Sequence, residues 1–378
     1  MPTVDPSTRQ LAFSNVLTAV DGRTGSDAWA VGSYEGPGRH DGKIMLTERW
    51  DGTRWSQVAT PNVLFFDEKL LAVSAAGANE AWAVGSTNQS GFAGTNPIAA
   101  HWNGSAWTIV PTPATTGSAK SILDGAVDFG SSNAWAVGRS RTGKALIEHW
   151  DGAAWSIVPS PAPSPPVGTT LAGSVLTGIS AVAPTDIWAV GSFSVSSGTT
   201  VDTLTLTMHY DGTAWRVVPS PNVAVRHPLN GARQVLGGVE AVRHDDVWAV
   251  GNTIDTASGS FLPDKTLILH WNGTAWSVVP SPDSPAEDVL SGVSALSPTD
   301  VWAVGQFVDR SGSTPIARTR TLHWNGAAWS VVASPNGPAG DTILNGVSAV
   351  PATGEVWAAG FTLASTPGSR TFVLHHGG

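Results

Sequence analysis

Two acidic side chains and one histidine are the residues of this sequence best suited to acid–base chemistry. Asp124 directly precedes a recurring glycine, Glu240 stands two positions after the corresponding glycine of another repeat, and His227 lies in a long connection. A carboxyl or imidazole group within hydrogen-bond reach of a substrate proton can act as a general acid or base. A pair formed by Asp124 and Glu240, or by either of them with His227, would indicate an enzyme. The sequence leaves open whether they approach one another.

A second group of side chains could bind a ligand without reacting with it. These aromatic and charged residues lie in or beside the long connections: Tyr34, Phe65, Phe66, Asp67, Arg139, Arg226, Arg233 and Phe261. A surface of mixed apolar and charged character suits a small organic molecule, a saccharide or a peptide. The alternative is that these are ordinary solvated side chains of surface loops.

Metal and thiol chemistry are not expected. The chain has no cysteine, which excludes disulfides, thiol nucleophiles and thiolate metal sites. Six of its ten histidines occupy one repeated position, one in each of six repeats: His101, His149, His209, His270, His323 and His375. Side chains distributed in this way do not converge on an ion, so we predict no metal and no cofactor. We expect each histidine instead to form a hydrogen bond with the Asp, Glu or Asn that opens a hexamer repeated along this chain.

That hexamer is the feature that organises the whole sequence. It occurs as DAWAVG, EAWAVG, NAWAVG, DIWAVG, DVWAVG twice, and EVWAAG. Its tryptophans, which are separated by 53, 53, 53, 60, 54 and 55 residues, are Trp29, Trp82, Trp135, Trp188, Trp248, Trp302 and Trp357. A period of this length without a helical pattern is typical of β-propellers.

Each period contains four strand-like runs. In the fifth repeat, the run after the hexamer ends at His270-Trp271, Asn272-Gly273 follows, and the last run starts at Trp276. An Asn-Gly or Asp-Gly pair between apolar runs predicts a two-residue hairpin turn with positive φ, and the following Pro ends the ladder. We therefore predict an all-β fold, a seven-bladed β-propeller with four antiparallel strands per blade, as one domain over residues 1–378.

The two ends of the chain are expected to complete one blade together. The C-terminal sequence stops where the other repeats have their last hairpin, so the seventh repeat lacks a fourth strand. Residues 3–7 resemble the fourth run of other repeats. We predict that this N-terminal strand completes the last blade and closes the ring as a monomer, which also removes an exposed sheet edge.

The innermost run of each repeat varies at two positions. Before the position of the recurring glycine, which is alanine in the first two repeats, stand Thr18, Leu71, Asp124, Thr177, Gly237, Ser291 and Asn345. Two positions after it, the acids Asp21 and Glu240 interrupt a series of small residues such as Ser180 and Ser294. Both positions are expected to lie beside a central channel.

The strings DVWAVG and LHWNGTAWSVVPSP resemble the Trp-rich propeller repeats of bacterial proteins, often called kelch-like or galactose-oxidase-like. The resemblance covers essentially the whole chain and implies the fold, but fold does not imply function. The Gly-Gly pair of kelch blades is absent from the hexamer. A copper-radical oxidase needs a Tyr–Cys pair, and this chain has no cysteine and only Tyr34 and Tyr210, so that activity is excluded.

Eighteen tryptophans suggest a carbohydrate binder, but every one falls on a repeated position. Seven lie in the hexamers, five follow the repeat histidine or its equivalent, and six follow the hairpin pair. Such regularity indicates that the indoles form the scaffold, where each buries about 150–250 Å². Binding residues are then expected where the repeats differ.

The composition restricts partners and location. The net charge of −9 without a cluster of Lys or Arg argues against nucleic acid. No apolar run reaches the ~20 residues that span a bilayer. The first residues lack the pattern of a signal peptide, so the location stays open, and an extracellular location is favoured if a leader was removed.

Three function classes remain after these restrictions. One is a module that binds a glycan, a peptide or a small molecule on the face with the long loops. Another is an enzyme, namely a non-redox hydrolase, lyase or cyclase, with a pocket on that face. The last is a protein-interaction scaffold.

Overall fold

The computed structural model describes residues 14–35, 42–61, 66–89, 95–113, 121–140, 142–223, 231–254, 264–337, 340–363 and 368–377, with the side chains of Phe66, Gln89 and Thr95 outside the description. Within these ranges the chain forms 27 β-strands. No helix in the described ranges is long and apolar enough to cross a membrane. The prediction of an all-β fold is confirmed.

The strands follow one another in groups of four along the chain. The first groups are β1 (Asn15–Thr24), β2 (Asp27–Glu35), β3 (Lys43–Trp50), β4 (Trp55–Gln57); β5 (Phe66–Gly77), β6 (Glu80–Gln89), β7 (Thr95–Trp102), β8 (Trp107–Val110); and β9 (Ile122–Asp128), β10 (Ala134–Arg139), β11 (Ala145–Trp150), β12 (Trp155–Ile157). The middle groups are β13 (Thr170–Ala183), β14 (Asp186–Ser197), β15 (Thr200–Tyr210), β16 (Trp215–Val218); and β17 (Arg233–Arg243), β18 (Asp246–Ile254), β19 (Lys265–Trp271), β20 (Trp276–Val278). The last groups are β21 (Asp288–Ser297), β22 (Asp300–Asp309), β23 (Ile316–Trp324), β24 (Trp329–Val331); and β25 (Thr342–Val350), β26 (Glu355–Leu363), β27 (Ser369–His376).

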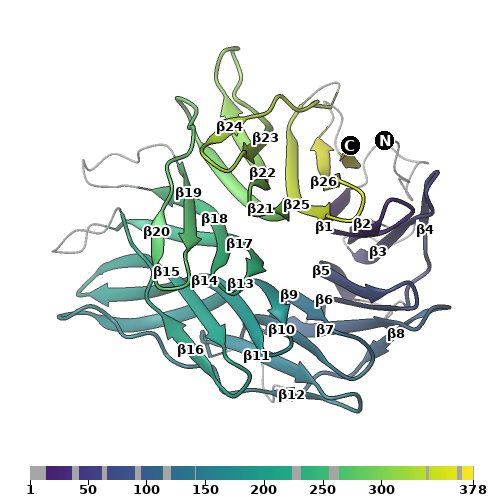
Figure 1. The fold of residues 1–378 in the computed structure, drawn as a ribbon, viewed down its shortest axis with the longest axis horizontal. Coiled ribbons are helices and arrows are strands. Elements are labelled where there is room, and N and C mark those ends of the chain that lie inside the picture. The colour runs from purple at the N-terminus through teal and green to yellow at the C-terminus, as the bar shows by residue number, and fades with distance from the viewer. Residues whose placement is uncertain are drawn as a thin grey trace.

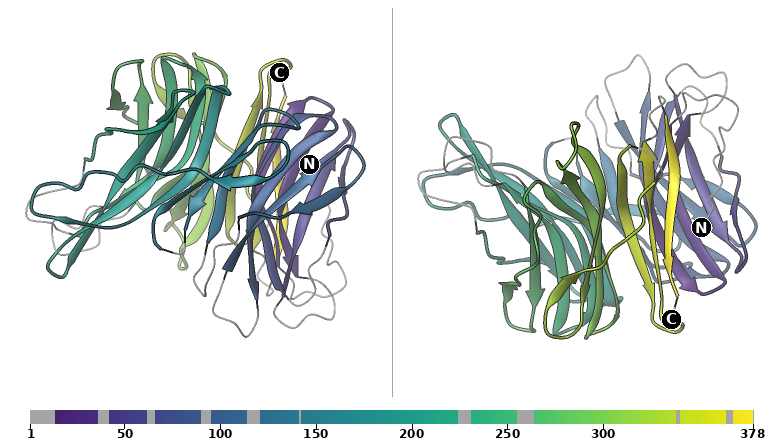
Figure 2. Two further views of the ribbon diagram at one scale, coloured as in Figure 1. Left: turned by 90° about the horizontal axis from the view of Figure 1, so that it is seen from below. Right: turned by 90° about the horizontal axis from the view of Figure 1, so that it is seen from above.

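Each group is an antiparallel meander, and most groups are separate sheets. The groups β13–β16 and β17–β20 form one eight-stranded sheet, because Thr203 and Arg233 pair in parallel register between them. The last sheet has three described strands. The sheets are arranged around a central axis, and the first strand of each group lies nearest to that axis (Figure 1). Figure 2 shows the same sheets from two sides. This is the architecture of a β-propeller.

The hexamer tryptophans form the core between adjacent sheets. Trp188 is 1% exposed and lies 4.5 Å from His209 of its own sheet, measured between ring centroids. From the next group of strands, Trp271 and Trp276 pack against it at 5.0 and 5.4 Å. The same arrangement recurs around Trp29, Trp82, Trp135, Trp248 and Trp357. The prediction that the repeated indoles form the scaffold is confirmed.

The first and last sheets share one of these cores. Trp357 of β26 packs against Trp50 and Trp55 at centroid distances of 5.3 and 5.5 Å. Leu17 of β1 belongs to the same buried cluster as Val373 of β27. Sheets from opposite ends of the sequence therefore pack against each other.

The repeat histidines have the partners that the sequence predicted. Each Nε2 lies near the residue that opens the hexamer: His101–Glu80 2.6 Å, His149–Asn133 3.0 Å, His209–Asp186 2.7 Å, His270–Asp246 2.8 Å, His323–Asp300 2.9 Å and His375–Glu355 3.3 Å. In the first sheet Arg49 takes the place of the histidine and donates to Asp27 at 3.0 Å. These pairs tie the second strand of each sheet to the third.

The outer hairpins differ from the predicted two-residue turns. Trp50 pairs with Trp55, so residues 51–54 form a four-residue loop. The Asp51 side chain accepts hydrogen bonds from the amides of Thr53 and Arg54, and Gly52 has a positive φ of 93°. A side-chain oxygen that accepts hydrogen bonds from the loop amides stabilises the loop, which explains why Asp or Asn occupies its first position. The two-residue prediction was therefore wrong.

A series of side-chain-to-backbone hydrogen bonds links the innermost strands. The acceptor stands two positions after the recurring glycine, and the donor is a backbone amide of the next group of strands. The links run from Ser74 to Asp128 N, Ser180 to Ala241 N, Ser294 to Ala349 N and Ser348 to Gly22 N, at 2.9–3.0 Å, and from Asp21 to Ala75 N at 2.7 Å. Glu240 accepts from Ala295 N in the same way. Val127, which cannot accept, interrupts this inner hydrogen-bond series between β9 and β13.

Candidate functional site

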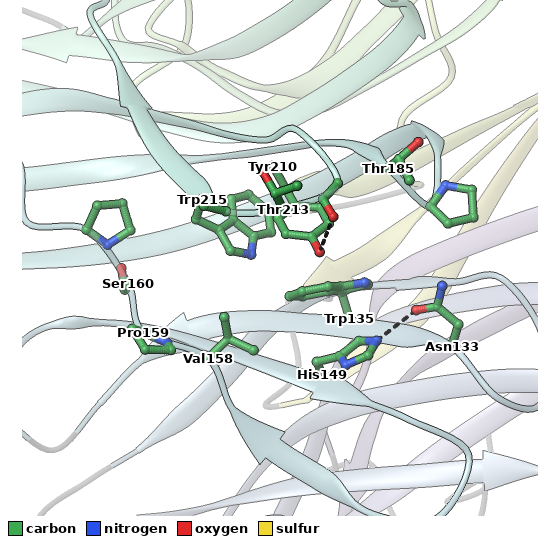
Figure 3. Close-up of a pocket in the computed structure, with 14 residues that line it drawn as sticks. Asn133, Trp135, His149, Val158, Pro159, Ser160, Thr185, Tyr210, Thr213 and Trp215 are labelled. Carbon is green, nitrogen blue, oxygen red and sulfur yellow. Dashed lines mark hydrogen bonds between the residues drawn. The ribbon is translucent and has the colours of Figure 1, made fainter.

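An open groove of about 820 Å³ lies between the β9–β12 sheet and the β13–β16 half of the eight-stranded sheet (Figure 3). It is lined by Asn133, Trp135, His149, Val158, Pro159, Ser160, Pro161, Pro184, Thr185, Tyr210, Gly212, Thr213, Ala214 and Trp215. Most of these residues come from the short turns and strand ends opposite the long connections. The groove is therefore a different place from the predicted loop-face site.

One substitution in the repeat accounts for the groove. Tyr210 occupies the position where five other groups carry a tryptophan and the last group carries His376. In four groups the indole N–H at this position donates to a turn carbonyl between the first two strands: Trp50 to Gly25, Trp102 to Ala78, Trp150 to Ser131 and Trp271 to His244. Tyr210 instead donates its hydroxyl to Gly212 of its own hairpin, at 3.0 Å. The smaller ring leaves the space beside Pro184 and Thr185 open.

Aromatic rings form the walls of the groove. Trp135 lies 4.8 Å from Tyr210 and 5.7 Å from Trp215, measured between ring centroids. Figure 3 shows Trp215 and Tyr210 on one side of the opening, with Val158 and His149 on the other. Rings held in fixed positions by the scaffold present flat apolar surface with little entropic cost on binding.

The groove carries no formal charge. None of the described residues that line it is Asp, Glu, Lys or Arg. Burial lowers the pKa of His149, although the Asp151 carboxylate opposes this shift, so the imidazole is neutral at pH 7. Its partner is Asn133, whereas the equivalent residue in each other group with a repeat histidine is an acid. The arrangement suits an uncharged ligand with an apolar face and hydroxyl groups.

A second cavity, of about 180 Å³, lies on the axis and is lined by the innermost strands. Asp124 borders it, and burial raises the pKa of this carboxyl to about 6, opposed by the positive charges of Arg139 and Lys69. Its Oδ2 has no hydrogen-bond partner among the described residues. Of the predicted site residues, the structure thus brings Asp124 and Arg139 into electrostatic contact.

Glu240 has a different environment from Asp124. Burial raises the pKa of Glu240 to about 7, and the nearby Asp21 adds to the shift, whereas the Ala295 amide and the Ser180 hydroxyl oppose it. Glu240 and Asp21 are both members of the inner hydrogen-bond series. No contact between Asp124 and Glu240 is found in the described ranges, and each carboxyl has its own neighbours.

The predicted ligand-binding residues are spread over several sheets. Tyr34 packs against the core shared by the first and last sheets, and Asp67 accepts a hydrogen bond from the Lys43 amide at 2.9 Å. Arg233 is exposed at the start of β17. Phe65, Arg226, His227, Phe261 and the side chain of Phe66 lie outside the described residues.

The groove residues were not among the predicted site residues. Two signals in the sequence point to them: Tyr210 is the one tyrosine at the repeated tryptophan position, and Asn133 is the one amide that opens a hexamer. Each is a departure from the repeat, but the sequence does not show that both departures border the same gap between sheets.

No protein-family model matches the chain, and no curated protein matches its sequence. Solved structures share its fold. One is an ulvan lyase of a new polysaccharide lyase family, bound to -[GlcA(1-4)Rha3S]-, at 10% identity and a TM-score of 0.55 over 94% of this chain and 93% of that chain. Another is the GH74 xyloglucanase of Xanthomonas campestris, at 13% identity and a TM-score of 0.55 over 93% of this chain and 53% of that chain. The six-bladed propeller of the Aleuria aurantia lectin aligns at 14% identity with a TM-score of 0.45 over 80% of this chain and 90% of that chain.

Proposed function

We propose that this protein is a ligand-binding β-propeller that recognises an uncharged saccharide in the groove between the β9–β12 sheet and the β13–β16 strands. The observation that carries the proposal is an aromatic-walled, charge-free groove at a gap where Tyr210 replaces the repeat tryptophan. A sugar ring has an apolar face that stacks on aromatic rings and hydroxyls that hydrogen-bond at their edges. Both complements are present, because Thr185, Ser160 and Asn133 border the aromatic walls.

Binding without turnover fits this groove better than hydrolysis or elimination. Glycoside hydrolysis generally needs two carboxyl groups that flank the scissile bond, and no lining residue is an acid. A peptide would bring charged termini or side chains that find no counter-charge here. Two of the proteins with a similar fold are named for polysaccharides, which agrees with a saccharide ligand.

The enzyme alternative belongs to the axial cavity. A hydrolase, lyase or cyclase acting there would use Asp124, whose buried carboxyl has a raised pKa of about 6, with Glu240 or His227 as a partner. The loop-face residues Tyr34, Phe65, Phe66, Asp67, Arg139, Arg226, Arg233 and Phe261 would then form the ligand surface. Replacing Asp124 by Asn would abolish turnover on this alternative and leave saccharide binding in the groove unchanged.

The substitution Tyr210→Trp tests the proposed function directly. The indole should fill the space beside Pro184 and Thr185 as it does in other sheets, so saccharide binding should fall at least tenfold while the melting temperature is kept or raised. The matched control is Tyr210→Phe, which removes the bond to Gly212 and leaves the groove open. An array of immobilised neutral oligosaccharides followed by titration calorimetry measures both. Equal binding by wild type and Tyr210→Trp would contradict the proposal.

We further propose that the eight-stranded sheet counts as two blades, which makes the fold a seven-bladed, kelch-like ring over residues 1–378 that acts as a monomer without metal or cofactor. Residues 3–7 would supply the fourth strand of the last blade. Support comes from the Trp357 contacts to Trp50 and Trp55 and from the parallel bridge between Ser14 and Ser369. Such a chain, of bacterial type, would bind glycans outside the cell if a leader directs it there.

Deleting residues 1–8 tests this closure. The deletion should lower the melting temperature by about 10 °C, because on this proposal β27 would lose the strand paired with it and the last blade would expose an edge. Residues 1–8 lie outside the described residues. Differential scanning calorimetry measures the change, and deletion of Gly377 and Gly378 from the other end is the control. A truncated protein with the same melting temperature as the full chain would refute the closure.

A further inference from the structure

Asn133 departs from the repeat at the point where the repeat borders the groove. The equivalent residues Glu80, Asp186, Asp246, Asp300 and Glu355 each place a carboxylate within 2.6–3.3 Å of the repeat histidine. At Asn133 an amide makes the same contact with His149 at 3.0 Å. The scaffold contact is therefore preserved while the charge is removed.

The amide is held in a defined position. The Asn133 backbone is fixed by the bonds from Phe129 N to its carbonyl, 2.9 Å, and from its own N to Gly130 O, 3.2 Å. The side-chain oxygen faces His149 (Figure 3), which leaves the Nδ2 with no hydrogen-bond partner in the described part of the chain. Asn133 is thus a lining residue with two N–H donors available at the edge of the aromatic walls.

The residue at position 133 determines whether the lining of the groove carries a charge. A carboxylate here would be the sole formal charge among the lining residues, since they include no other acid and no Lys or Arg. A desolvated charge needs a counter-charge. An ammonium group of an amino sugar finds no carboxylate beside Asn133, and the carboxylate of a uronic acid finds no cation.

We propose that Asn133 is the specificity-determining residue of the groove: it donates a hydrogen bond to a ligand hydroxyl and restricts the site to neutral saccharides, excluding amino sugars and uronic acids. This inference rests on the proposed function. It adds the charge class of the ligand and the residue that selects it.

The experiment compares wild type with Asn133→Asp on an array of matched neutral, amino and uronic-acid saccharides in the gluco, galacto and manno series. Wild type should bind neutral members at least tenfold more tightly than their charged counterparts. In Asn133→Asp, binding of the neutral member should fall about tenfold through loss of the donor, and the preference for the amino sugar over the neutral sugar should rise at least tenfold. The fold should persist, because five other groups of strands carry this acid–histidine pair.

The matched control is Asn272→Asp, which adds the same charge to a distant hairpin where Asp51 and Asp211 show that an acid is accommodated. Its selectivity should equal that of wild type. If neutral sugars bind in a way that depends on Tyr210, but Asn133→Asp keeps the preference for neutral over charged saccharides, this inference is overturned. The proposed function would then still stand. If no saccharide binds to wild type in a way that Tyr210→Trp abolishes, both the proposed function and this inference are overturned.

Discussion

Replacing Trp188 by alanine will lower the free energy of unfolding by about 3–5 kcal/mol, the range for removing a fully buried large side chain. The indole is 1% exposed and packs between His209 of its own sheet and Trp271 and Trp276 of the next group of strands. The cavity would lie in the contact between two groups, where backbone hydrogen bonds are few. Urea denaturation followed by tryptophan fluorescence and circular dichroism measures the change.

Trp271→Ala is the control for this prediction. Trp271 packs against the Trp188 ring from the next group of strands. It is half-buried, and its indole N–H donates a hydrogen bond to the His244 carbonyl. Its removal lets water reach the turn and should cost clearly less than removal of Trp188. If the two variants lose equal stability, the assignment of the hexamer tryptophan as the centre of each core is wrong.

Replacing Glu148 by methionine will stabilise the protein by about 3 kcal/mol at pH 8. The Glu148 side chain is fully buried, and neither carboxyl oxygen has a hydrogen-bond partner among the described residues. It lies on the same face of β11 as Leu146, which packs with Trp82 and Leu123. Corresponding positions in later groups carry Met208, Leu269, Leu322 and Leu374, so methionine fits the site.

The gain should depend on pH in a defined direction. Burial raises the pKa of Glu148 from its ordinary value of 4.5 to about 7. Between these pH values the unfolded chain releases a proton that the folded chain keeps, so wild type loses stability as the pH rises. The difference between Glu148→Met and wild type should therefore be small at pH 4.5, grow up to pH 7 and stay constant above it.

Thermal or urea unfolding from pH 4.5 to 8.5 measures this difference. Leu269→Met, at the position that corresponds to Glu148 in a later group, is the control: neither side chain titrates, so its difference from wild type should not vary with pH. A Glu148→Met difference that is flat with pH would contradict the burial of a titrating carboxyl at this position.

Much of the fold could be predicted from the sequence because each scaffold contact repeats. The hexamer tryptophan recurs with every period, and the histidine and the acid recur in most of them, so strand order and the His–acid pairs follow from the pattern alone. The hairpins were mispredicted for a local reason: Asp51 closes a four-residue loop through its own side chain, and an Asp-Gly pair does not distinguish this from a two-residue turn.

The candidate site could not be predicted in the same way. Asp21 and Glu240 were recognised as exceptions, but their partners are backbone amides of another sheet, which no side-chain pattern reveals. Asn133 and Tyr210 belong to different repeats, and the groove exists because packing brings their sheets together. A site formed between repeats is visible only when the neighbours in space are known.

The inner hydrogen-bond series has a consequence for how such a chain can grow. Each link joins a side chain of one group of strands to a main-chain amide of the next group, as Ser180 does with Ala241. The group of strands that supplies the amide therefore needs no particular side chain at that position. A newly duplicated repeat can form this hydrogen bond with both of its neighbours as soon as it appears. Gene duplication can change the number of repeats without a compensating mutation in the neighbours, and single repeats such as the one with Val127 can drift at this position while the remaining links persist.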